Sequence, residues 1–215
     1  MKNIDRQFRL TRTWSNSELE KFSNLFSGKI INVSAGENID KEGRTYDKYF
    51  SNHSEFWISN FSPGSYRGYT GKENELLIDL EKDLPSELEA GFDVVFNHTT
   101  LEHVFNVFKA FENICKLSND IVILVVPFAQ VQHESPDGYL DYFRFTPTCI
   151  RRLFKEQGFK VLYESCNNDF NAAVYLFFIA SRKPEKWVNN FPAYKPINEA
   201  GKWIGEVKKK KWWQF

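Results

Sequence analysis

The residues best suited to chemistry follow an apolar run near the middle of the chain. The run F-D-V-V-F, residues 92–96, has the pattern of a buried strand and leads directly into Asn97, His98, Glu102 and His103. Histidine titrates near neutrality, so two histidines beside a carboxylate are suited to acid–base chemistry. The structural alternative is an ordinary turn, in which His103 bonds only to backbone and Glu102 faces the positive end of a following helix.

A second polar cluster follows the most apolar run of the chain, I-V-I-L-V-V at residues 121–126. Its members are His133, Asp137, Tyr139, Asp141, Tyr142 and Arg144. The tyrosine rings could stack on a sugar face, and the arginine could pair with an acid or a phosphate. The alternative is a structural ion pair between Asp141 and Arg144 that fixes the loop. No ligand cluster requires a metal, although His133, Glu134, Asp137 and Asp141 do not exclude one.

Alternating strands and helices must position these residues. The predicted strands are residues 29–33, 57–59, 75–80, 92–96, 121–126, 159–165 and 173–180. The predicted helices are residues 104–117, residues 146–157, and a short one that a capping box S-N-S-E at residues 15–18 opens and Gly28 ends. This order predicts an α/β fold with a mostly parallel sheet, an antiparallel C-terminal edge hairpin and helices on both faces.

Ligands of an open parallel sheet bind beyond the carboxyl ends of its strands, so the residues after each strand are the candidates. Ser34, Ala35 and Gly36 follow the first strand, where small side chains let a ligand approach the backbone. Asp79 and Leu80 end the third, where the carboxylate is an acceptor for amino or hydroxyl groups. A plain turn and a solvated acid are the alternatives. Residues 37–74 are predicted to contain a long loop.

Length and composition limit the class of protein. A chain of 215 residues that is 42% hydrophobic predicts one domain with an appendage, here residues 29–184 with an N-terminal helical segment 1–28 and a tail 185–215. The 28 basic residues balance 28 acidic ones, so no overall field favours nucleic acid. Three scattered cysteines and the lack of a signal peptide or spanning segment predict a cytoplasmic protein. The sequence predicts no oligomeric state.

Taken in order, these segments resemble class I S-adenosylmethionine-dependent methyltransferases, in particular small ones similar to those of bacterial surface-polysaccharide clusters. The resemblance covers roughly residues 29–183. Its most specific parts are F-D-V-V-F-N-H-T-T-L-E-H-V and P-F with H-E-S-P-D-G-Y-L-D-Y-F-R-F-T-P. The chain departs from the pattern at Asn32 and Ser34, which replace an acid and a glycine, and at Asn60, which stands where an acid often holds the ribose.

The resemblance implies a Rossmann-like fold with a seven-stranded sheet and S-adenosylmethionine as cofactor. The cofactor-binding residues that it implies are Ser34, Ala35, Gly36, Asn60, Asp79, Leu80, Asn97 and His98, with Asp79 near the adenine and Asn97 and His98 beside the methionine portion. Methyl transfer needs an aligned acceptor and a group that removes its proton. We expect His133 to be that base, with Asp137, Asp141 and Arg144 in the catalytic set and His103, Tyr139 and Tyr142 at the substrate.

The tail combines lysines with interfacial aromatic residues. Ile197, Ala200, Ile204 and Val207 can share a helical face, and four lysines at 208–211 precede Trp212, Trp213 and Phe215. This pattern predicts either a peripheral membrane anchor formed by residues 197–215 at the inner face of the membrane, or an arm that packs on its own domain or on a partner subunit.

Two functions from different classes remain open at this point. The first is an O-methyltransferase acting on a sugar hydroxyl of a bacterial surface glycan or its precursor, with a lipid or a small metabolite as alternative acceptors. The second is a non-catalytic module that keeps the fold and binds a glycan-assembly partner through its tail. A nicotinamide-dependent oxidoreductase ranks lower, because no G-x-G-x-x-G follows the first strand.

Overall fold

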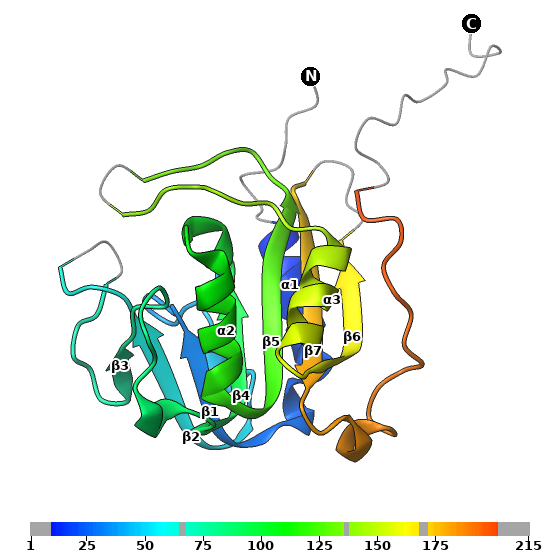
Figure 1. Ribbon diagram of the computed structural model, residues 1–215, viewed down its shortest axis with the longest axis horizontal. Coiled ribbons are helices and arrows are strands. Elements are labelled where there is room, and N and C mark those ends of the chain that lie inside the picture. Colours follow the sequence, from blue (N-terminus) through cyan, green and yellow to red (C-terminus); the bar gives the residue numbers. More distant parts are fainter. Residues whose placement is uncertain (1–9, 65–67, 136–137, 168–171, 202–215) are drawn as a thin grey trace, which may run out of the picture.

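A seven-stranded mixed sheet forms the centre of the protein (Figure 1). The computed structural model describes residues 10–64, 68–135, 138–167 and 172–201. The strands are β1 (Ser27–Val33), β2 (Asn52–Asn60), β3 (Glu75–Leu77), β4 (Phe92–His98), β5 (Ser118–Ala129), β6 (Lys160–Cys166) and β7 (Val174–Ser181), in the spatial order β3-β2-β1-β4-β5-β7-β6. β1 to β5 pair in parallel, whereas β7 is antiparallel to both β5 and β6. The predicted parallel sheet with its C-terminal hairpin is confirmed.

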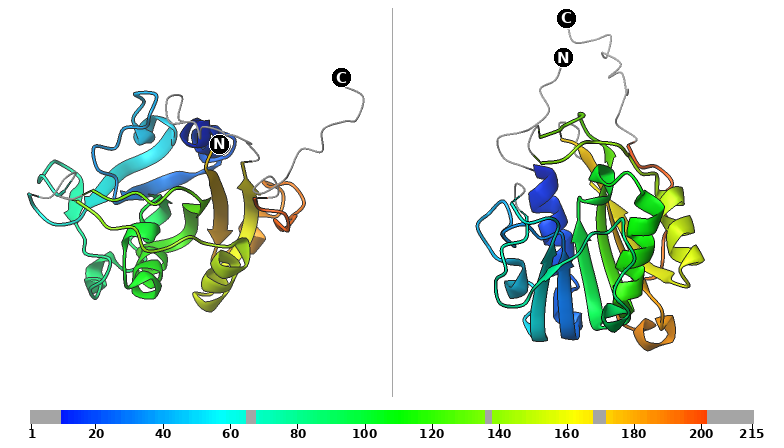
Figure 2. Two further views of the ribbon diagram at one scale, coloured as in Figure 1. Left: turned by 90° about the horizontal axis from the view of Figure 1, so that it is seen from above. Right: turned by 60° about the vertical axis from the view of Figure 1, so that its left-hand side comes forward.

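Three α-helices flank the sheet. α2 (Val107–Leu117) and α3 (Pro147–Glu156) cover one face, and α1 (Leu10–Glu20) covers the other, as Figure 2 shows from above. Short 3-10 helices occur at Ser23–Leu25, Tyr46–Lys48, Ser86–Leu88, Leu101–His103 and Pro184–Trp187. The helix over residues 146–157 is confirmed, with the Thr146 hydroxyl accepting from the Cys149 N–H as its N-terminal cap.

The core divides into two layers because side chains alternate across each strand. On β1, Ile30 packs with α1, whereas Ile31 packs with α2 and α3. All residues from 121 to 126 on β5 are buried, three toward each layer, as expected of a central strand. Burying each such side chain contributes about 1.5–3 kcal/mol, so these two layers hold the strand ends in place.

The N-terminal capping box is wrong as a prediction. α1 begins at Leu10 at the latest, and Ser15 lies inside it. Its hydroxyl donates to the carbonyl oxygen of Arg12 and contacts the ring of His98, so it caps nothing. The prediction failed because the partner of Ser15 is 83 residues away in sequence.

Three other boundaries also moved. β2 is longer than predicted and β3 ends at Leu77. α2 starts three residues later than predicted, because residues 101–103 form a 3-10 turn in front of it. This turn, rather than a helix terminus, therefore carries Glu102 and His103.

The described part of the tail packs on its own domain. The Trp187 indole N–H donates to Asp120 Oδ2, and the Phe191 ring stacks on Phe22. The backbone N–H of Ile197 donates to Glu164 Oε1. Residues 192–199 are extended and run beside β6, so the predicted helical face does not begin at Ile197 (Figure 1). Residues 202–215, with the lysine run and the last tryptophans, lie outside the described residues.

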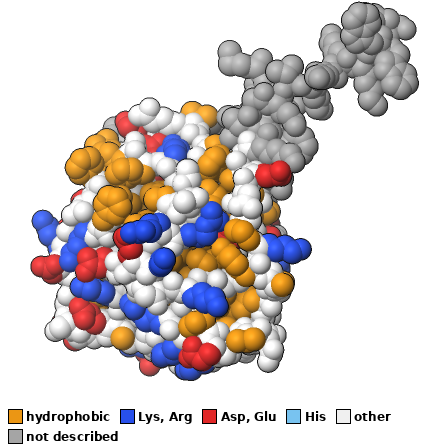
Figure 3. Space-filling view, turned by 45° about the vertical axis from the view of Figure 1, so that its right-hand side comes forward, with side chains coloured by type: hydrophobic (Ala, Val, Ile, Leu, Met, Phe, Trp, Pro, Cys, Tyr) orange, Lys and Arg blue, Asp and Glu red, His pale blue; other side chains and the backbone are white. Residues whose placement is uncertain are grey.

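The charge balance of the sequence recurs on the surface. On the face seen in Figure 3, lysine and arginine side chains are interspersed with aspartate and glutamate, and hydrophobic side chains form separate small patches. Within the described residues, none of the helices has both the length and the apolar character needed to cross a bilayer.

Candidate functional site

One large cavity, of about 980 Å³, opens at the carboxyl ends of the parallel strands. It lies where the strand order reverses between β1 and β4, the usual ligand position in such sheets. Eleven of the predicted site residues line it: Ser34, Ala35, Gly36, Asn60, Asp79, Leu80, His98, His103, His133, Tyr139 and Tyr142. Asn97, Asp141 and Arg144 are not among the lining residues, and Asp137 lies outside the described residues.

Backbone strain marks the strand ends at this cavity. Ser34 follows β1 with φ 58°, and Thr99 follows β4 with φ 51°. Both are in the left-handed region, which costs a residue with a Cβ atom about 1–2 kcal/mol. Gly36, with φ 59°, adopts the same region without that cost. Strained non-glycine residues at the ends of two adjacent central strands are typical of a functional site.

The side of the cavity formed by the ends of β1 to β3 is here called the amide wall, after Asn60. The Asn60 side chain accepts from the Gly36 N–H at 2.7 Å and donates to the Gly36 carbonyl oxygen at 3.1 Å. Its second N–H donates to Glu75 Oε1 at 2.6 Å. Both donors of Asn60 are thus engaged inside the chain, and only one lone pair of Oδ1 is left for a ligand.

Glu75 supports Asn60 from behind. Burial would raise the pKa of this carboxyl, but hydrogen bonds from Asn60, Lys72 and Thr70 outweigh it and lower the pKa to about 2. Glu75 is therefore a fixed anion that orients the Asn60 amide. No local sequence pattern identifies Glu75, because it stands at the start of β3 and not at its carboxyl end.

Asp79 has a different setting on the same wall. Its Oδ1 accepts the backbone N–H of Glu81 at 2.9 Å, and its neighbours Ile78 and Leu80 are buried and line the cavity. A carboxylate between two apolar side chains suits a flat heterocycle that carries an amino group.

Asn97 and His98 point to opposite sides of β4, because side chains alternate along a strand. The Asn97 amide is fully buried and donates to the Val33 carbonyl oxygen at 2.9 Å, which ties β4 to β1. His98 lines the cavity and points toward α1. The donor side of the Asn97 amide therefore links two strands, and its place beside a ligand stays a prediction.

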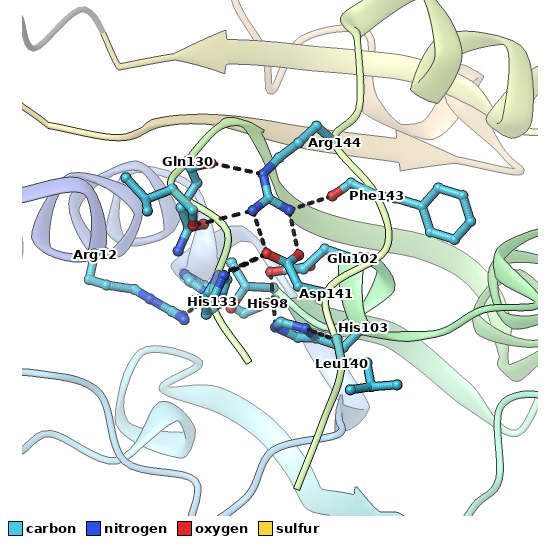
Figure 4. Close-up of polar contacts among 12 residues, drawn as sticks. Arg12, His98, Glu102, His103, Gln130, His133, Leu140, Asp141, Phe143 and Arg144 are labelled. Atoms are coloured by element: carbon cyan, nitrogen blue, oxygen red, sulfur yellow. Dashed lines mark hydrogen bonds and ion pairs between the residues drawn. The ribbon is translucent and has the colours of Figure 1, made fainter. Parts of the chain in front are cut away.

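Both ring nitrogens of His98 are bonded (Figure 4). Arg12 can only donate, so His98 Nδ1 is the acceptor of its N–H. Nε2 then carries the proton and donates to Ser15 Oγ at 2.8 Å. Burial, followed by the charge of Arg12, lowers the pKa of His98 well below its usual value, so the ring is neutral. Arg12 and Ser15 stand one helical turn apart on α1, so both side chains reach the same imidazole ring.

The opposite side of the cavity is here called the histidine wall; His103 and His133 line the cavity there, and the buried Glu102 stands behind them. The His103 and His133 rings lie edge to face with centroids 4.9 Å apart, and the Tyr139 ring is 4.3 Å from that of His103. His103 Nδ1 donates to the Leu140 carbonyl oxygen at 2.7 Å, so its Nε2 carries a lone pair. Burial lowers the pKa of His103.

Glu102 stands behind the two histidines. Its side chain is 1% exposed, and its Oε1 lies 3.7 Å from His103 Nε2. Burial raises the pKa of this carboxyl to about 7, against the lowering influence of Arg12 and Arg144. The backbone carbonyl of Glu102 accepts from the N–H groups of Tyr142 and Phe143, which fixes residues 138–146 over it.

An ion pair between Asp141 and Arg144 holds this loop from beneath. Arg144 binds both oxygens of Asp141 and donates to the carbonyl oxygens of Gln130, Val131 and Phe143. All five of its N–H groups are engaged, which leaves none for an acid or phosphate of a substrate. Burial would raise the pKa of Asp141, but Arg144 and the His133 backbone N–H lower it to about 2. The geometry favours the structural alternative for this pair.

Unbonded polar atoms concentrate on the histidine wall. Seven buried side-chain nitrogen or oxygen atoms of the described residues lack a hydrogen bond; three of them belong to Glu102 and His133, and a fourth to Gln130, which also lines the cavity. Buried polar atoms are rarely left unpaired, so such a cluster indicates a place for a ligand. His133 Nδ1, 3.3 Å from Asp141 Oδ2, is one of the four.

Comparison with known proteins gives similarity in structure alone. No protein-family model matches the chain, and no curated protein matches it in sequence. A candidate methyltransferase from Bacillus halodurans is similar over 78% of this chain and 98% of its own, with a TM-score of 0.56 and 8% identity. An S-adenosylmethionine-dependent methyltransferase from Clostridium acetobutylicum gives 0.55 and 9%, over 82% of this chain and 95% of its own.

A third similar structure carries a ligand. Magnesium protoporphyrin IX methyltransferase from Synechocystis, with bound S-adenosylmethionine, has a TM-score of 0.53 and 14% identity, over 81% of this chain and 79% of its own. Together these structures show that the chain has the Rossmann-like fold of class I S-adenosylmethionine-dependent methyltransferases. At such identities the likeness concerns the fold, and the roles of individual residues rest on the geometry described above.

Proposed function

We propose that this protein is an S-adenosylmethionine-dependent methyltransferase that methylates a hydroxyl oxygen. The observation that carries the proposal is the large cavity at the β1–β4 switch point, bounded by two different walls. The amide wall offers a shaped backbone and one acid between apolar side chains. The histidine wall offers imidazole nitrogens without hydrogen bonds, and the fold is one that methyltransferases share.

The described residues fit the cofactor at three points. Asp79, between Ile78 and Leu80, suits the amino group and flat ring of adenine. The left-handed backbone around Gly36 leaves room for a ligand to approach the main chain. Arg12 brings a positive charge to the cavity lining, the complement of the carboxylate on the amino-acid portion.

Asn60 fits less fully. It stands where an acid often holds ribose hydroxyls, but its donors are bound to Gly36 and Glu75. A ribose hydroxyl could donate only to the remaining lone pair of Asn60 Oδ1. We therefore expect cofactor affinity to depend on Asp79 more than on Asn60.

The bound cofactor supplies a methyl group on a positively charged sulfur. The chain must align an acceptor oxygen with that carbon and remove its proton, whose pKa is high for a sugar hydroxyl. We assign proton removal to His133, since its ring lines the cavity and Asp141 Oδ2, 3.3 Å from Nδ1, can stabilise the protonated ring. His103, with a free Nε2, assists in positioning the hydroxyl.

The acceptor that we propose is a sugar of a bacterial surface glycan or its precursor. The support is the resemblance of the segment H-E-S-P-D-G-Y-L-D-Y-F-R-F-T-P, together with two tyrosines on the cavity lining that can face a sugar ring. Tyr142 is 42% exposed and Tyr139 packs on His103. Attachment to the inner face of a membrane remains our hypothesis for the tail, and among the predicted residues 197–215 it now concerns residues 202–215.

A calorimetric titration of the purified protein with S-adenosylhomocysteine tests the proposal without knowledge of the acceptor. We expect micromolar binding to the wild type and none of nicotinamide adenine dinucleotide, which serves as the control nucleotide. Absence of S-adenosylhomocysteine binding at millimolar concentration would overturn the proposal. The same result would favour a non-catalytic module with a methyltransferase fold.

A further inference from the structure

Glu102 is the buried acid that the proposed function leaves without a partner. Its carboxylate is 1% exposed, and neither oxygen accepts a hydrogen bond from the described residues. A buried carboxyl group in this state is costly, since its solvation by water has been lost and nothing replaces it. A ligand that binds both the carboxylate and the neighbouring histidines would remove that cost.

The three members of the histidine wall are close enough to share one ion. Within the described residues, Glu102, His103 and His133 each offer a ligand atom, and these atoms lie within 4.8 Å of one another. A tetrahedral ion with bonds of about 2.1 Å holds its ligands roughly 3.4 Å apart. Glu102 Oε1 and His103 Nε2 are already at 3.7 Å, so modest side-chain rotations would complete the site.

We propose that Glu102, His103 and His133 form a binding site for a divalent transition-metal ion. Two imidazoles with one carboxylate favour zinc, iron or cobalt, whereas magnesium and calcium prefer oxygen ligands alone. The site leaves coordination positions open toward the cavity, because both histidines line it.

The neighbours of the two histidines match those of metal ligands. The Nδ1–H of His103 donates to the Leu140 carbonyl oxygen, which fixes the ring and directs the lone pair of Nε2 toward Glu102. Asp141 lies 3.3 Å from a ring nitrogen of His133 and is itself held by Arg144. Such outer carboxylate and carbonyl partners orient imidazole ligands and increase their basicity.

The role of the ion rests on the proposed function, although its binding does not. A hydroxyl group that coordinates a divalent ion loses its proton at much lower pH. An ion held by Glu102, His103 and His133 would thus acidify the acceptor hydroxyl, whose proton would pass to solvent. In the metal-bound protein His133 would therefore be a ligand of the ion and not the base.

The test is a titration of the EDTA-treated, purified chain with Co²⁺, followed by visible absorption. We expect one Co²⁺ site, with the visible absorption bands of a Co²⁺ ion of low coordination number. Zn²⁺ should displace the bound Co²⁺ and abolish these bands. Substitutions His103→Ala and His133→Ala should each weaken Co²⁺ binding by more than about 100-fold, the upper effect of removing an outer-shell partner. His53→Ala is the matched control, since His53 bonds to Phe50 at the other end of the sheet. This variant should bind Co²⁺ as the wild type does.

Two results would overturn the site: a wild type that binds no Co²⁺ at millimolar concentration, or histidine variants that bind it as the wild type does. Glu102→Gln keeps the side-chain shape but removes the carboxylate ligand, so it separates loss of a ligand from loss of folding. Thermal unfolding of each metal-free variant checks that the variant is folded. S-adenosylhomocysteine is titrated into the same samples. Its binding without Co²⁺ binding would remove the metal site alone, and Co²⁺ binding without it would remove the methyltransferase proposal alone.

Discussion

The two walls of the cavity differ in how completely their polar groups are used. On the amide wall, Asn60 bonds to the backbone of Gly36 and donates to Glu75, so both of its donors are used. On the histidine wall, Glu102 and His133 are buried or half-buried and carry atoms without hydrogen bonds. Polar groups of similar burial therefore serve different ends in one cavity.

The difference separates residues that maintain the shape from residues that await a ligand. A bonded polar network stabilises a loop, and breaking it should lower stability. A buried polar group without hydrogen bonds lowers stability, so its removal should not destabilise the protein but should affect binding or turnover. Substitutions on the two walls should thus have opposite profiles, and four experiments test that contrast.

The largest effect is expected on the histidine wall. His133→Ala should lower turnover about 10²–10⁴-fold, the usual contribution of an acid–base group. Its S-adenosylhomocysteine affinity and its free energy of unfolding should stay close to those of the wild type, since Nδ1 makes no hydrogen bond. Release of S-adenosylhomocysteine with a panel of nucleotide sugars measures turnover. Retained turnover would mean that His133 is not the base. His53→Ala is the control and should keep the turnover of the wild type.

On the amide wall, Asn60→Asp should destabilise the protein. The new carboxylate would lose both donors of Asn60 and face Glu75, whose pKa of about 2 keeps it ionised. Two buried carboxylates in contact should cost about 3–5 kcal/mol, similar to breaking a buried ion pair. Urea unfolding at neutral pH measures the loss.

The same substitution also discriminates between two roles of Asn60. An unchanged free energy of unfolding together with tighter S-adenosylhomocysteine binding would mean that the side chain faces the ribose and not Glu75. Asn189→Asp, at an exposed position of the tail, is the control for the added charge and should leave stability unchanged.

Asp79 should behave as a ligand-binding residue although it belongs to the amide wall. Asp79→Ala should weaken S-adenosylhomocysteine binding about 10–100-fold, the loss expected for one hydrogen bond to a charged group. Asp83→Ala is the matched control, because Asp83 is an exposed acid of the same segment paired with Lys109. Equal affinities of both variants and the wild type would remove Asp79 from the adenine site.

Much of the fold could be predicted because its signals are local. The apolar run at residues 121–126 and the turn residues around α3 identified a buried strand and a helix correctly. Strand ends then gave eleven cavity-lining residues, since parallel strands place their carboxyl ends together.

The missing parts of the site depend on long-range contacts. Arg12 reaches His98 across 86 residues and Glu75 meets Asn60 across 15 residues, and neither pair has a local pattern. The burial of Glu102 could not be predicted either, because a helix start was expected where a 3-10 turn beneath residues 138–146 occurs. Tertiary packing thus decides which polar groups are bonded.

The smallest effect is expected for His98. It lines the cavity, but both of its ring nitrogens are hydrogen-bonded, as the polar groups of the amide wall are. Its pKa in the folded state is lower than the usual 6.5, mainly through burial and then through Arg12 and Lys41. Below the usual pKa of 6.5, the unfolded chain binds more protons than the folded chain. The stabilisation from the neutral His98 is therefore complete above pH 6.5 and is lost as the pH falls toward the folded-state pKa. If His98 stays neutral in the folded state, the free energy of unfolding should be lower by about 1.4 kcal/mol at roughly pH 5.5 than above the usual histidine pKa.

Urea unfolding of wild type and His98→Gln at neutral and mildly acidic pH measures this contribution as a difference. His98→Gln should be less stable than the wild type at neutral pH, because the bonds to Arg12 and Ser15 are weakened. The gap should narrow on acidification by about 1 kcal/mol. Parallel pH profiles for the two proteins would mean that His98 is free to protonate. His98 would then belong with the unbonded groups of the histidine wall. The boundary between bonded and unbonded polar groups would then lie at β4.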